Sequence, residues 1–205
     1  LAANARICED YPRVAEQAKK AGWEFMGHAY DQMPIHKNEN QEAMINKSMD
    51  VIERFTGKRP VGWLGPGLTQ TLETPELLKA AGVQYIGDWV YDDEPTVIKT
   101  EKGPLVTLAY TVELNDIPMM IVQYHQSDYL LKRTIDQFDR LYAEGAHRAK
   151  VMALAIHPYI SGQPHRIKYL EAIYDYVNRF EGVLHWNGEQ ILDWYKSFAG
   201  DKLKK

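Results

Sequence analysis

Short apolar runs alternate along this chain with stretches of helical periodicity, at intervals of roughly 25 to 40 residues. The runs at 23–27, 61–64, 83–86 and 151–156 are bounded by turn residues or by helical segments. Runs of this kind are typical of strands that are buried on both faces of a parallel sheet. The alternation therefore predicts an α/β fold that is built from βαβ units.

Helices are predicted where apolar residues recur every three or four positions between turn residues. These segments are 12–21, 40–57, 74–82, 129–144, 164–177 and 188–198. Further short strands are predicted at 1–7, 105–112, 119–123 and 183–186. Because no repeat, low-complexity tract or linker interrupts the pattern, we expect a single domain over residues 1–205.

Charge and composition narrow the class of partner. The formal net charge is −4 and the isoelectric point is near 6.0, with Lys and Arg scattered along the chain. This favours a small molecule or carbohydrate and predicts no nucleic-acid or membrane partner. The one cysteine, Cys8, rules out an internal disulfide and a thiolate zinc cluster, so we expect a cytoplasmic protein. The chain begins at Leu1 without a signal sequence, and we expect a segment to be missing upstream.

Two histidines follow predicted strands directly. Run 23–27 leads into His28, and run 151–156 leads into His157. Parallel strands bring their carboxyl ends to one edge, where α/β folds carry their chemistry. A histidine in such a place is also compatible with a packing role and a hydrogen bond to a carbonyl. We interpret His28 and His157 as candidate catalytic residues and expect both on the same rim.

Other polar side chains near strand ends are candidates as well. Asp88 and Asp116 each follow a predicted strand, and a carboxylate beside an imidazole fixes the tautomer of the ring and raises its basicity. For Asp116 a turn-capping role is the alternative. The Gly- and Pro-rich segment 59–67 is interpreted either as a ligand loop or as a tight crossover, and it lacks the spacing of a nucleotide-binding loop. His147 and His185 are interpreted as surface or packing residues.

Five segments together resemble a known family. In order they are Gly27-His28, Arg59-Pro60-x-Gly62-Trp63, Tyr85-x-x-Asp88, Asn115-Asp116 and Leu154-Ala155-Ile156-His157-Pro158. They resemble the motifs of the NodB-type polysaccharide deacetylase superfamily, and most of all its branch of cofactor-independent allantoinases. The resemblance implies a distorted (β/α) barrel of about seven parallel strands that lacks the first strand of the family here. It also implies a hydrolase of non-peptide carbon–nitrogen bonds that acts on an acetamido or cyclic amide substrate.

The resemblance also assigns roles to single residues. His157 matches the acid that protonates the leaving group, His28 the first histidine of a His-x-x-x-His metal motif, and Asp88 an acidic residue of the site. The second metal histidine would fall at Gln32, and His36 lies four positions later. Together with Gln32, the residues expected to bind substrate are Arg59, Trp63, Asp116, Tyr159 and His125. The acidic pair of the family has no counterpart before His28, so the expected cofactor is either none or a single zinc at His28 and His36.

Three functions remain open at this point. The favoured one is an amide hydrolase of the kind described above. A zinc-dependent carbohydrate deacetylase or acetyl esterase is the first alternative. A non-catalytic carbohydrate-binding protein or degenerate subunit is the second alternative, favoured by the missing acidic pair. We also expect a homo-oligomer, because a barrel edge that lacks its first strand needs to be covered.

Overall fold

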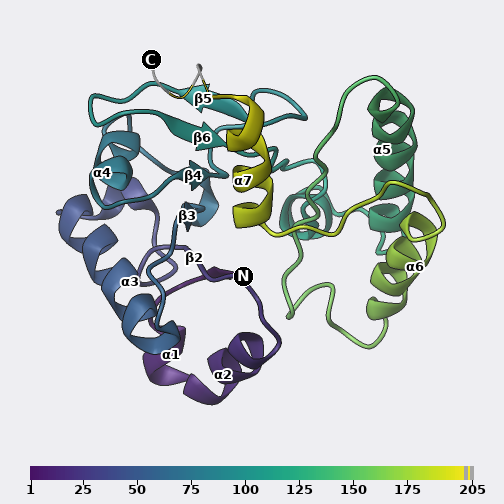
Figure 1. The fold of residues 1–205 in the computed structure, drawn as a ribbon. Helices are drawn as coiled ribbons and strands as arrows, with labels where there is room; N and C mark the ends of the chain where they lie inside the picture. Colours follow the sequence, from purple (N-terminus) through teal and green to yellow (C-terminus); the bar gives the residue numbers. More distant parts are fainter. Residues whose placement is uncertain (201–202, 204–205) are drawn as a thin grey trace. The chain divides into compact units, whose positions relative to one another are not determined.

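The computed structural model describes residues 1–200 and 203. The chain forms two compact units (Figure 1). The first unit comprises residues 1–91, 95–108 and 186–205, and the second comprises residues 92–94 and 109–185. The expected single domain without its first strand stays a prediction.

A mostly parallel sheet forms the centre of the first unit. Among the described residues it has six strands in the order β1-β2-β3-β4-β6-β5. The strands are β1 (Ala2–Ala3), β2 (Met26–Gly27), β3 (Gly62–Trp63), β4 (Tyr85–Ile86), β5 (Thr96–Ile98) and β6 (Leu105–Thr107). Neighbouring strands run parallel except β5, which pairs antiparallel with β6 at the edge. The α/β class is thus confirmed, whereas the antiparallel edge strand was not predicted.

Helices connect the strands of this unit. They are α1 (Ile7–Asp10), α2 (Pro12–Lys20), α3 (Gln41–Thr56), α4 (Thr74–Ala80), α7 (Gly188–Phe198) and the 3-10 turns η1 (Ile35–Lys37) and η2 (Pro66–Leu68). The bounds of α3 follow from its caps. Asn40 accepts a hydrogen bond from the Ala43 N–H at 2.9 Å, and Gly57 ends the helix with a φ of 84°.

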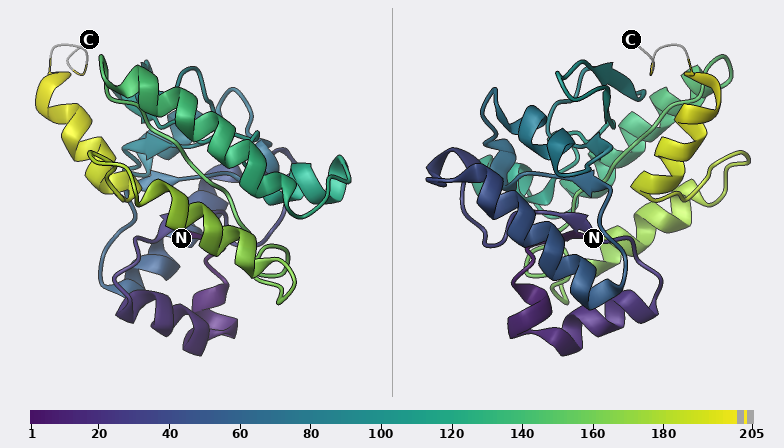
Figure 2. Two further views of the ribbon diagram at one scale, coloured as in Figure 1. Left: turned by 90° about the vertical axis from the view of Figure 1, so that its right-hand side faces the viewer. Right: turned by 60° about the vertical axis from the view of Figure 1, so that its left-hand side comes forward.

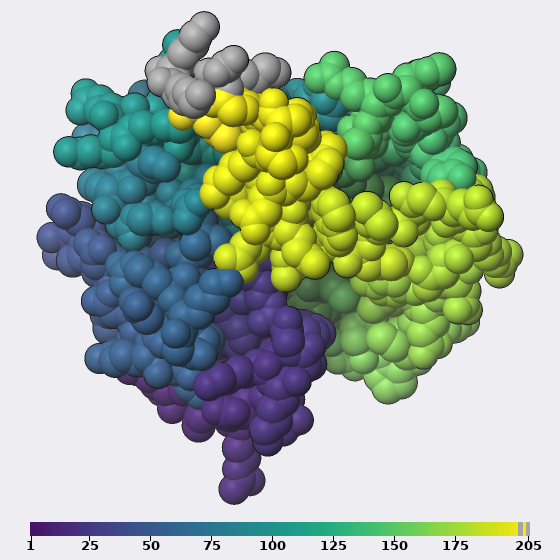
Figure 3. Space-filling model, in the orientation of Figure 1, coloured from purple at the N-terminus to yellow at the C-terminus, as the bar shows by residue number. Residues whose placement is uncertain are grey.

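Adjacent residues of β4 face opposite sides of the sheet, as the pleat requires. Ile86 packs in a core with residues of α3 and α4, while Tyr85 packs in another with Leu192 and Tyr195 of α7. Figure 3 shows the α7 surface in yellow beside the blue and teal surface of the sheet segments of this unit. The sheet is therefore buried on both faces, which explains the continuous apolar runs of its strands.

The second unit is mainly helical. It contains η3 (Ile117–Val122), α5 (Tyr129–Gly145) and α6 (Ile167–Val177), and α5 and α6 lie side by side in both views of Figure 2. Asn115 and Ala155 form an isolated parallel bridge. The core of the unit includes Met119, Leu130 and Ile173, which come from all three helical elements.

Three of the predicted segments are not strands in the structure. Of the predicted strand 119–123, residues 119–122 lie in the π-helical turn η3, because Pro118 suits the first turn of a helix and the consecutive residues Met119 and Met120 are both buried. The run 151–156 is extended and pairs only at Ala155 among the described residues. Residues 183–186 form no strand, and Leu184 is exposed.

Candidate active site

Polar groups follow neighbouring parallel strands at the carboxyl edge of the first unit. His28 follows β2, Gly65 lies just after β3, and Asp88 follows β4. The strands continue their pairing up to this edge, since the Leu64 N–H donates to the Gly27 carbonyl at 2.9 Å. The register of the sheet therefore brings these segments to one edge, as the sequence predicted for α/β strands.

His28 is tied to the backbone on both sides of its strand. Its N–H donates to the Ala3 carbonyl at 3.0 Å, and its carbonyl accepts a hydrogen bond from the Asn4 amide. The ring nitrogen Nδ1 contacts the carbonyl of Leu64. As a carbonyl is only an acceptor, Nδ1 carries the proton in this contact. The carbonyl of the neighbouring strand thus fixes the orientation of the His28 ring.

Asp88 is a buried carboxyl group at the same edge. Its Oδ1 accepts the Gly65 N–H at 2.8 Å, and Oδ2 is buried without a hydrogen-bond partner among the described residues. A Cβ on Gly65 would lie 2.6 Å from Oδ1, so glycine is needed for this approach. Burial raises the pKa of Asp88 to about 7, against the smaller opposing effect of its backbone hydrogen bonds. Asp88 thus holds the loop after β3 through Oδ1, and its catalytic role stays a prediction.

A histidine–aspartate pair lies in the second unit. Asp116 is fully buried, and its Oδ1 lies 2.6 Å from Nδ1 of His157. Its Oδ2 accepts the backbone N–H of His157 at 2.8 Å and the hydroxyl of Ser161 at 2.7 Å. The imidazole side chain is about one-third exposed, with 32% of its surface accessible. With Nδ1–H donating to the carboxylate, Nε2 is the nitrogen available for proton transfer.

The Asp116 carboxyl stays ionised despite its burial. Burial alone would raise its pKa, but the hydrogen bonds from the His157 ring, the His157 N–H and the Ser161 hydroxyl outweigh this effect and hold the pKa below its ordinary value. A carboxylate fixed in this way sets the tautomer and the direction of the imidazole. Of the roles considered for Asp116, the geometry therefore supports orientation of His157 over turn capping.

The backbone places Asp116 opposite the loop of His157. The Ala155 N–H donates to the Leu114 carbonyl at 2.9 Å, and the Asp116 N–H donates to the Ala155 carbonyl at 3.2 Å. Asn115 supports the turn, as its Oδ1 accepts the Ile117 N–H at 2.9 Å. A single parallel bridge thus brings two residues 41 positions apart into hydrogen-bond contact.

Two predicted substrate-binding residues have structural roles instead. Trp63 is fully buried in the core between the sheet and α3, because β3 is covered on both faces. Arg59 precedes β3 and so lies at the amino end of the strand, away from the carboxyl edge. Its guanidinium pairs with Asp50 at 2.7 Å and Glu53 at 2.8 Å on α3. We therefore correct both assignments from ligand contact to packing and helix attachment.

The remaining candidates lie in loops or at helix ends. Gln32 is exposed in the loop after His28, and His36 is exposed with Nδ1 3.3 Å from the Thr69 carbonyl. Tyr159 is exposed, and its ring centroid lies 5.8 Å from that of His157. His125 stacks on Tyr129 at 4.2 Å, next to α5. Tyr159 is thus the predicted binding residue in ring contact with the catalytic candidate, and the substrate roles of the others stay predictions.

The two histidines expected to bind zinc do not complete a metal site. Among residues 1–200 and 203, no three His, Cys, Asp or Glu side chains gather closely enough to hold a metal ion. Nδ1 of His28 is already engaged with the Leu64 carbonyl, and His36 approaches the Thr69 carbonyl. Three protein ligands are usual for catalytic zinc, so these residues do not fit such a centre.

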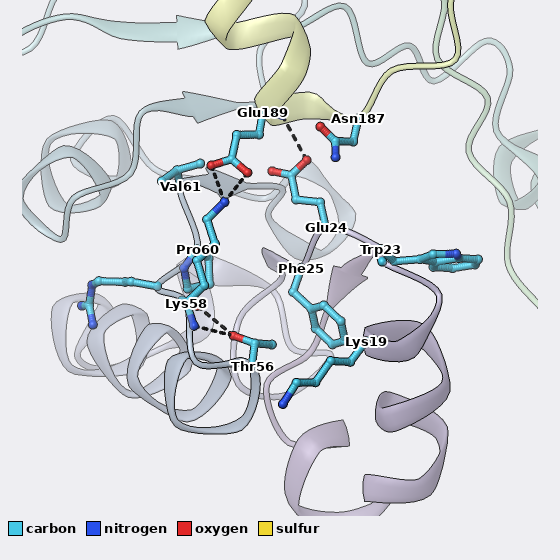
Figure 4. A pocket seen from close by; sticks show the side chains of 12 residues that line it. Lys19, Trp23, Glu24, Phe25, Thr56, Lys58, Pro60, Val61, Asn187 and Glu189 are labelled. Atoms are coloured by element: carbon cyan, nitrogen blue, oxygen red, sulfur yellow. Dashed lines mark hydrogen bonds and ion pairs between the residues drawn. The ribbon is translucent and has the colours of Figure 1, made fainter.

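A hollow of about 270 Å³ lies in the first unit at the amino ends of the strands, and Figure 4 shows its side chains. Lys58 pairs with Glu189 at 2.6 Å across its mouth. Glu24 accepts hydrogen bonds from the Tyr85 hydroxyl at 2.7 Å and the Glu189 N–H at 3.0 Å. These groups thus pair with one another and attach α7 to the sheet, which indicates a structural role for the residues that line this hollow.

Sequence reasoning missed two groups that support the His157 pair. Ser161 is one, although it lies four residues after His157, where a tight turn returns to its start. The other is Tyr110, whose hydroxyl accepts a hydrogen bond from the Asn115 amide at 2.8 Å. Neither follows a strand end or a periodic pattern, so only the fold brings them to the pair.

The comparisons with known proteins agree with this architecture. Residues 2–86 match the family model described as "Polysaccharide deacetylase". A peptidoglycan deacetylase of Helicobacter pylori is 29% identical over 219 residues, which cover 90% of this chain and 74% of that protein. The crystal structure of Puue allantoinase superposes with a TM-score of 0.89 at 25% identity, covering 96% of this chain and 67% of that chain. A probable polysaccharide deacetylase from Pseudomonas aeruginosa PAO1 gives a TM-score of 0.88 with the same identity and coverage.

The fold and the relatives together define a class, a hydrolase of carbon–nitrogen bonds that acts on amides. The chain is similar to polysaccharide deacetylases, as its motifs predicted. The structural neighbours named above share the (β/α) barrel fold that the resemblance implied. No helix in the described part of the chain is long and apolar enough to cross a membrane.

Proposed function

We propose that this protein hydrolyses the carbon–nitrogen bond of an acetamido group or a cyclic amide, with His157 as the proton-transfer residue. The observation that carries the proposal is the buried Asp116 carboxylate, which binds Nδ1 of His157 at 2.6 Å and leaves Nε2 available. A histidine oriented in this way is the usual group for general acid–base catalysis near neutral pH.

The proposed reaction needs one proton to move twice. Water attacks the amide carbonyl carbon while Nε2 of His157 takes a proton from it, and the imidazolium is stabilised by Asp116. The carbon–nitrogen bond then breaks, and Nε2–H gives the proton to the leaving nitrogen. The products are a carboxylic acid and an amine or, for a cyclic amide, one opened molecule that carries both groups. Tyr159, exposed beside the ring, is proposed to contact the substrate.

The direct test replaces His157 by Gln, which keeps polarity and removes the titratable ring. We expect kcat to fall at least a hundredfold on a substrate that the wild type hydrolyses, since this is the usual contribution of general acid–base catalysis. Chitooligosaccharides and allantoin represent the acetamido and the cyclic classes. Release of acetate or ring opening is followed by chromatography. The matched control is His147→Gln, because His147 is exposed at the end of α5. Turnover by the His157 variant at the wild-type rate would refute the proposal.

A metal-dependent carbohydrate deacetylase is a second candidate, favoured by the similarity to the peptidoglycan deacetylase of Helicobacter pylori. Unlike the first candidate function, this one would need a bound metal ion, so removal of metal distinguishes the two. If the protein were a non-catalytic binding protein, it would hydrolyse neither substrate class. A cytoplasmic location, a homo-oligomer and a catalytic role for His28 remain proposals that follow from the sequence.

A further inference from the structure

One buried hydroxyl in the second unit belongs to no motif that the sequence analysis singled out. Ser161 is 2% exposed, and its Oγ lies 2.7 Å from Oδ2 of Asp116. Because Asp116 accepts through Oδ2, the hydroxyl is the donor. A serine buried against an ionised carboxylate contributes a charge-assisted hydrogen bond, which is stronger than a bond between neutral groups.

Ser161 and His157 hold the two oxygens of the same carboxylate. Oδ1 of Asp116 binds the imidazole, while Oδ2 binds both the His157 N–H at 2.8 Å and the Ser161 hydroxyl. Rotation of the carboxylate about its Cβ–Cγ bond would break all three contacts together. The plane of the carboxylate, and with it the direction of the imidazole, is therefore fixed from both sides.

The loop between the two residues is tightly closed. The N–H groups of Ile160 and Ser161 donate to the His157 carbonyl at 2.9 and 3.0 Å. Ile160 is 1% exposed and packs in the core with Met119. A Cβ on the following residue, Gly162, would overlap the Pro158 carbonyl. The backbone thus leaves the hydroxyl of Ser161 little freedom to turn away from Asp116.

We propose that Ser161 is a positioning residue for the amide hydrolysis proposed above: its hydroxyl locks the Asp116 carboxylate in the plane that aims Nε2 of His157. Since Ser161 is buried, it does not touch the substrate and acts only through Asp116. The catalytic role of Ser161 rests on the proposed function, whereas the effect of its hydroxyl on the Asp116 carboxylate does not.

The hydroxyl also stabilises the negative charge of Asp116. Among the described residues that act on this carboxyl, His157 is titratable, and the other partners are the Ser161 hydroxyl and the His157 N–H. In Ser161→Ala, Oδ2 keeps a single hydrogen bond in a buried position, so the pKa of Asp116 rises. One hydrogen bond to a charged group corresponds to a change of about one pH unit.

The first test measures kcat, KM and the pH profile of Ser161→Ala. We expect kcat to fall about tenfold with KM unchanged, because a positioning bond is lost while no substrate contact is. The acid limb of the profile is expected to move about one unit to higher pH. Ser161→Thr keeps the hydroxyl and is expected to restore both values toward the wild type. Ser161→Cys, with its weaker donor, is expected to lie between the two and serves where the Ala variant does not fold.

The matched control is Thr134→Val in α5. Thr134 is fully buried in the same unit, and its hydroxyl has no hydrogen-bond partner among the described residues. Its removal deletes a buried hydroxyl without touching Asp116, so the pH profile is expected to stay unchanged. A shift shared by Ser161→Ala and Thr134→Val would overturn the proposal in favour of a general packing effect.

A second readout does not depend on activity. The carboxyl carbon of Asp116 is followed by NMR in aspartate-labelled protein and identified by its loss in Asp116→Asn. Its titration is expected at higher pH in Ser161→Ala than in the wild type or Ser161→Thr. An unchanged titration together with an unchanged pH profile would overturn the role of Ser161. Absence of any hydrolysis by the wild type would count against the proposed function, whereas the titration would still decide whether Ser161 holds the carboxylate.

Discussion

Two carboxyl groups that are both shielded from solvent have opposite protonation behaviour. Asp116 receives three hydrogen bonds, one of them from an imidazole, and its pKa lies below the ordinary value. Asp88 receives the Gly65 N–H on one oxygen, and the other has no partner among the described residues. Burial, opposed only in part by backbone hydrogen bonds, raises the pKa of Asp88 to about 7. Hydrogen bonds therefore stabilise the anion of Asp116, whereas burial favours the protonated form of Asp88.

The raised pKa of Asp88 predicts a pH-dependent cost to stability. Below the ordinary pKa of 3.8 both folded and unfolded states hold the proton, so there is no cost. Between about pH 4 and 7 only the unfolded state releases it, so the free energy of unfolding falls as pH rises. The full cost, on the order of 4 kcal/mol, is present above pH 7. Asp88→Asn removes this titration while its carbonyl still accepts the Gly65 N–H.

We expect Asp88→Asn to match the wild type near pH 4 and to be more stable by a few kcal/mol at pH 8. Urea unfolding followed by circular dichroism across this pH range measures the difference. Asp136→Asn is the control, because Asp136 is exposed in an ion pair with Lys132 on α5. If Asp88→Asn were less stable than the wild type at pH 8, the carboxyl would be a needed anion and our interpretation of its burial would be wrong.

At the scale of single residues, His157 and Asp116 were singled out because each follows a predicted strand. The structure pairs their side chains, but an isolated bridge between Asn115 and Ala155, and not the two predicted strands, places them. Trp63 was misassigned because it lies within β3, which is covered on both faces, and not in the loop that follows the strand. Ser161 was missed because its role arises from a turn that closes on His157, which no periodicity reveals.

The strands are short, and glycine lets them pack closely against large side chains. Gly62 in β3 pairs with Tyr85 in β4, whose ring packs over it. The ring of Tyr85 is 2% exposed, and Glu24 accepts its hydroxyl at 2.7 Å. A Cβ on Gly62 would overlap this ring, which is held at both ends and cannot move aside. Close packing between β3 and β4 therefore requires glycine at this position.

We expect Gly62→Ala to lower the free energy of unfolding by about 2 kcal/mol or more, as overpacking of a core does. Gly145→Ala is the matched control, because a Cβ at this last residue of α5 meets open space. Alanine suits a helix better than glycine, so this control is expected to gain about 0.5 kcal/mol. Thermal unfolding of both variants is the measurement. Equal stability of Gly62→Ala and wild type would show that the Tyr85 ring can shift.

At the scale of elements, helices were predicted closely and strands less well. Segments 12–21, 40–57 and 188–198 differ from α2, α3 and α7 by at most one residue at each end, because caps and periodicity are local signals. Residues 119–122 of the predicted strand 119–123 lie in a π-helical turn, since a short apolar run does not distinguish a buried turn from a strand. The edge strand β5 has no apolar run, and pairing with β6 alone defines it.

For the whole molecule, the two compact units are not consecutive stretches of the chain. The first unit takes its last helix from residues beyond the second unit, and that helix supplies Leu192 and Tyr195 to the core around Tyr85. The sequence pattern does not indicate that the chain returns to the first unit, because all predicted βαβ units have a similar pattern. The ion pair of Lys58 with Glu189 joins residues 131 positions apart, and only the fold reveals it.

Metal dependence is a property of the whole molecule, because the ligands of the expected zinc come from separate segments. In the described part of the chain, no three suitable side chains gather into a site, and His28 is engaged by the Leu64 carbonyl. We therefore expect prolonged dialysis against a chelator to leave kcat/KM for a hydrolysed substrate within about twofold of the untreated protein. Elemental analysis of the dialysed sample verifies that metal has been removed.

The opposite result would have a specific interpretation. Loss of activity on dialysis and recovery with zinc would support the metal-dependent candidate, and the ligands would then be sought by substitution. His28→Ala and His36→Ala would lower the zinc content if these residues bind the ion, whereas the control His185→Ala would not, since His185 pairs with Asn178 at 2.7 Å. Zinc bound through His28 would also have to coexist with, or displace, the contact of Nδ1 with Leu64. A change in the tautomer of this ring on adding zinc, observed by nitrogen NMR, would therefore distinguish direct ligation from an effect of the ion elsewhere.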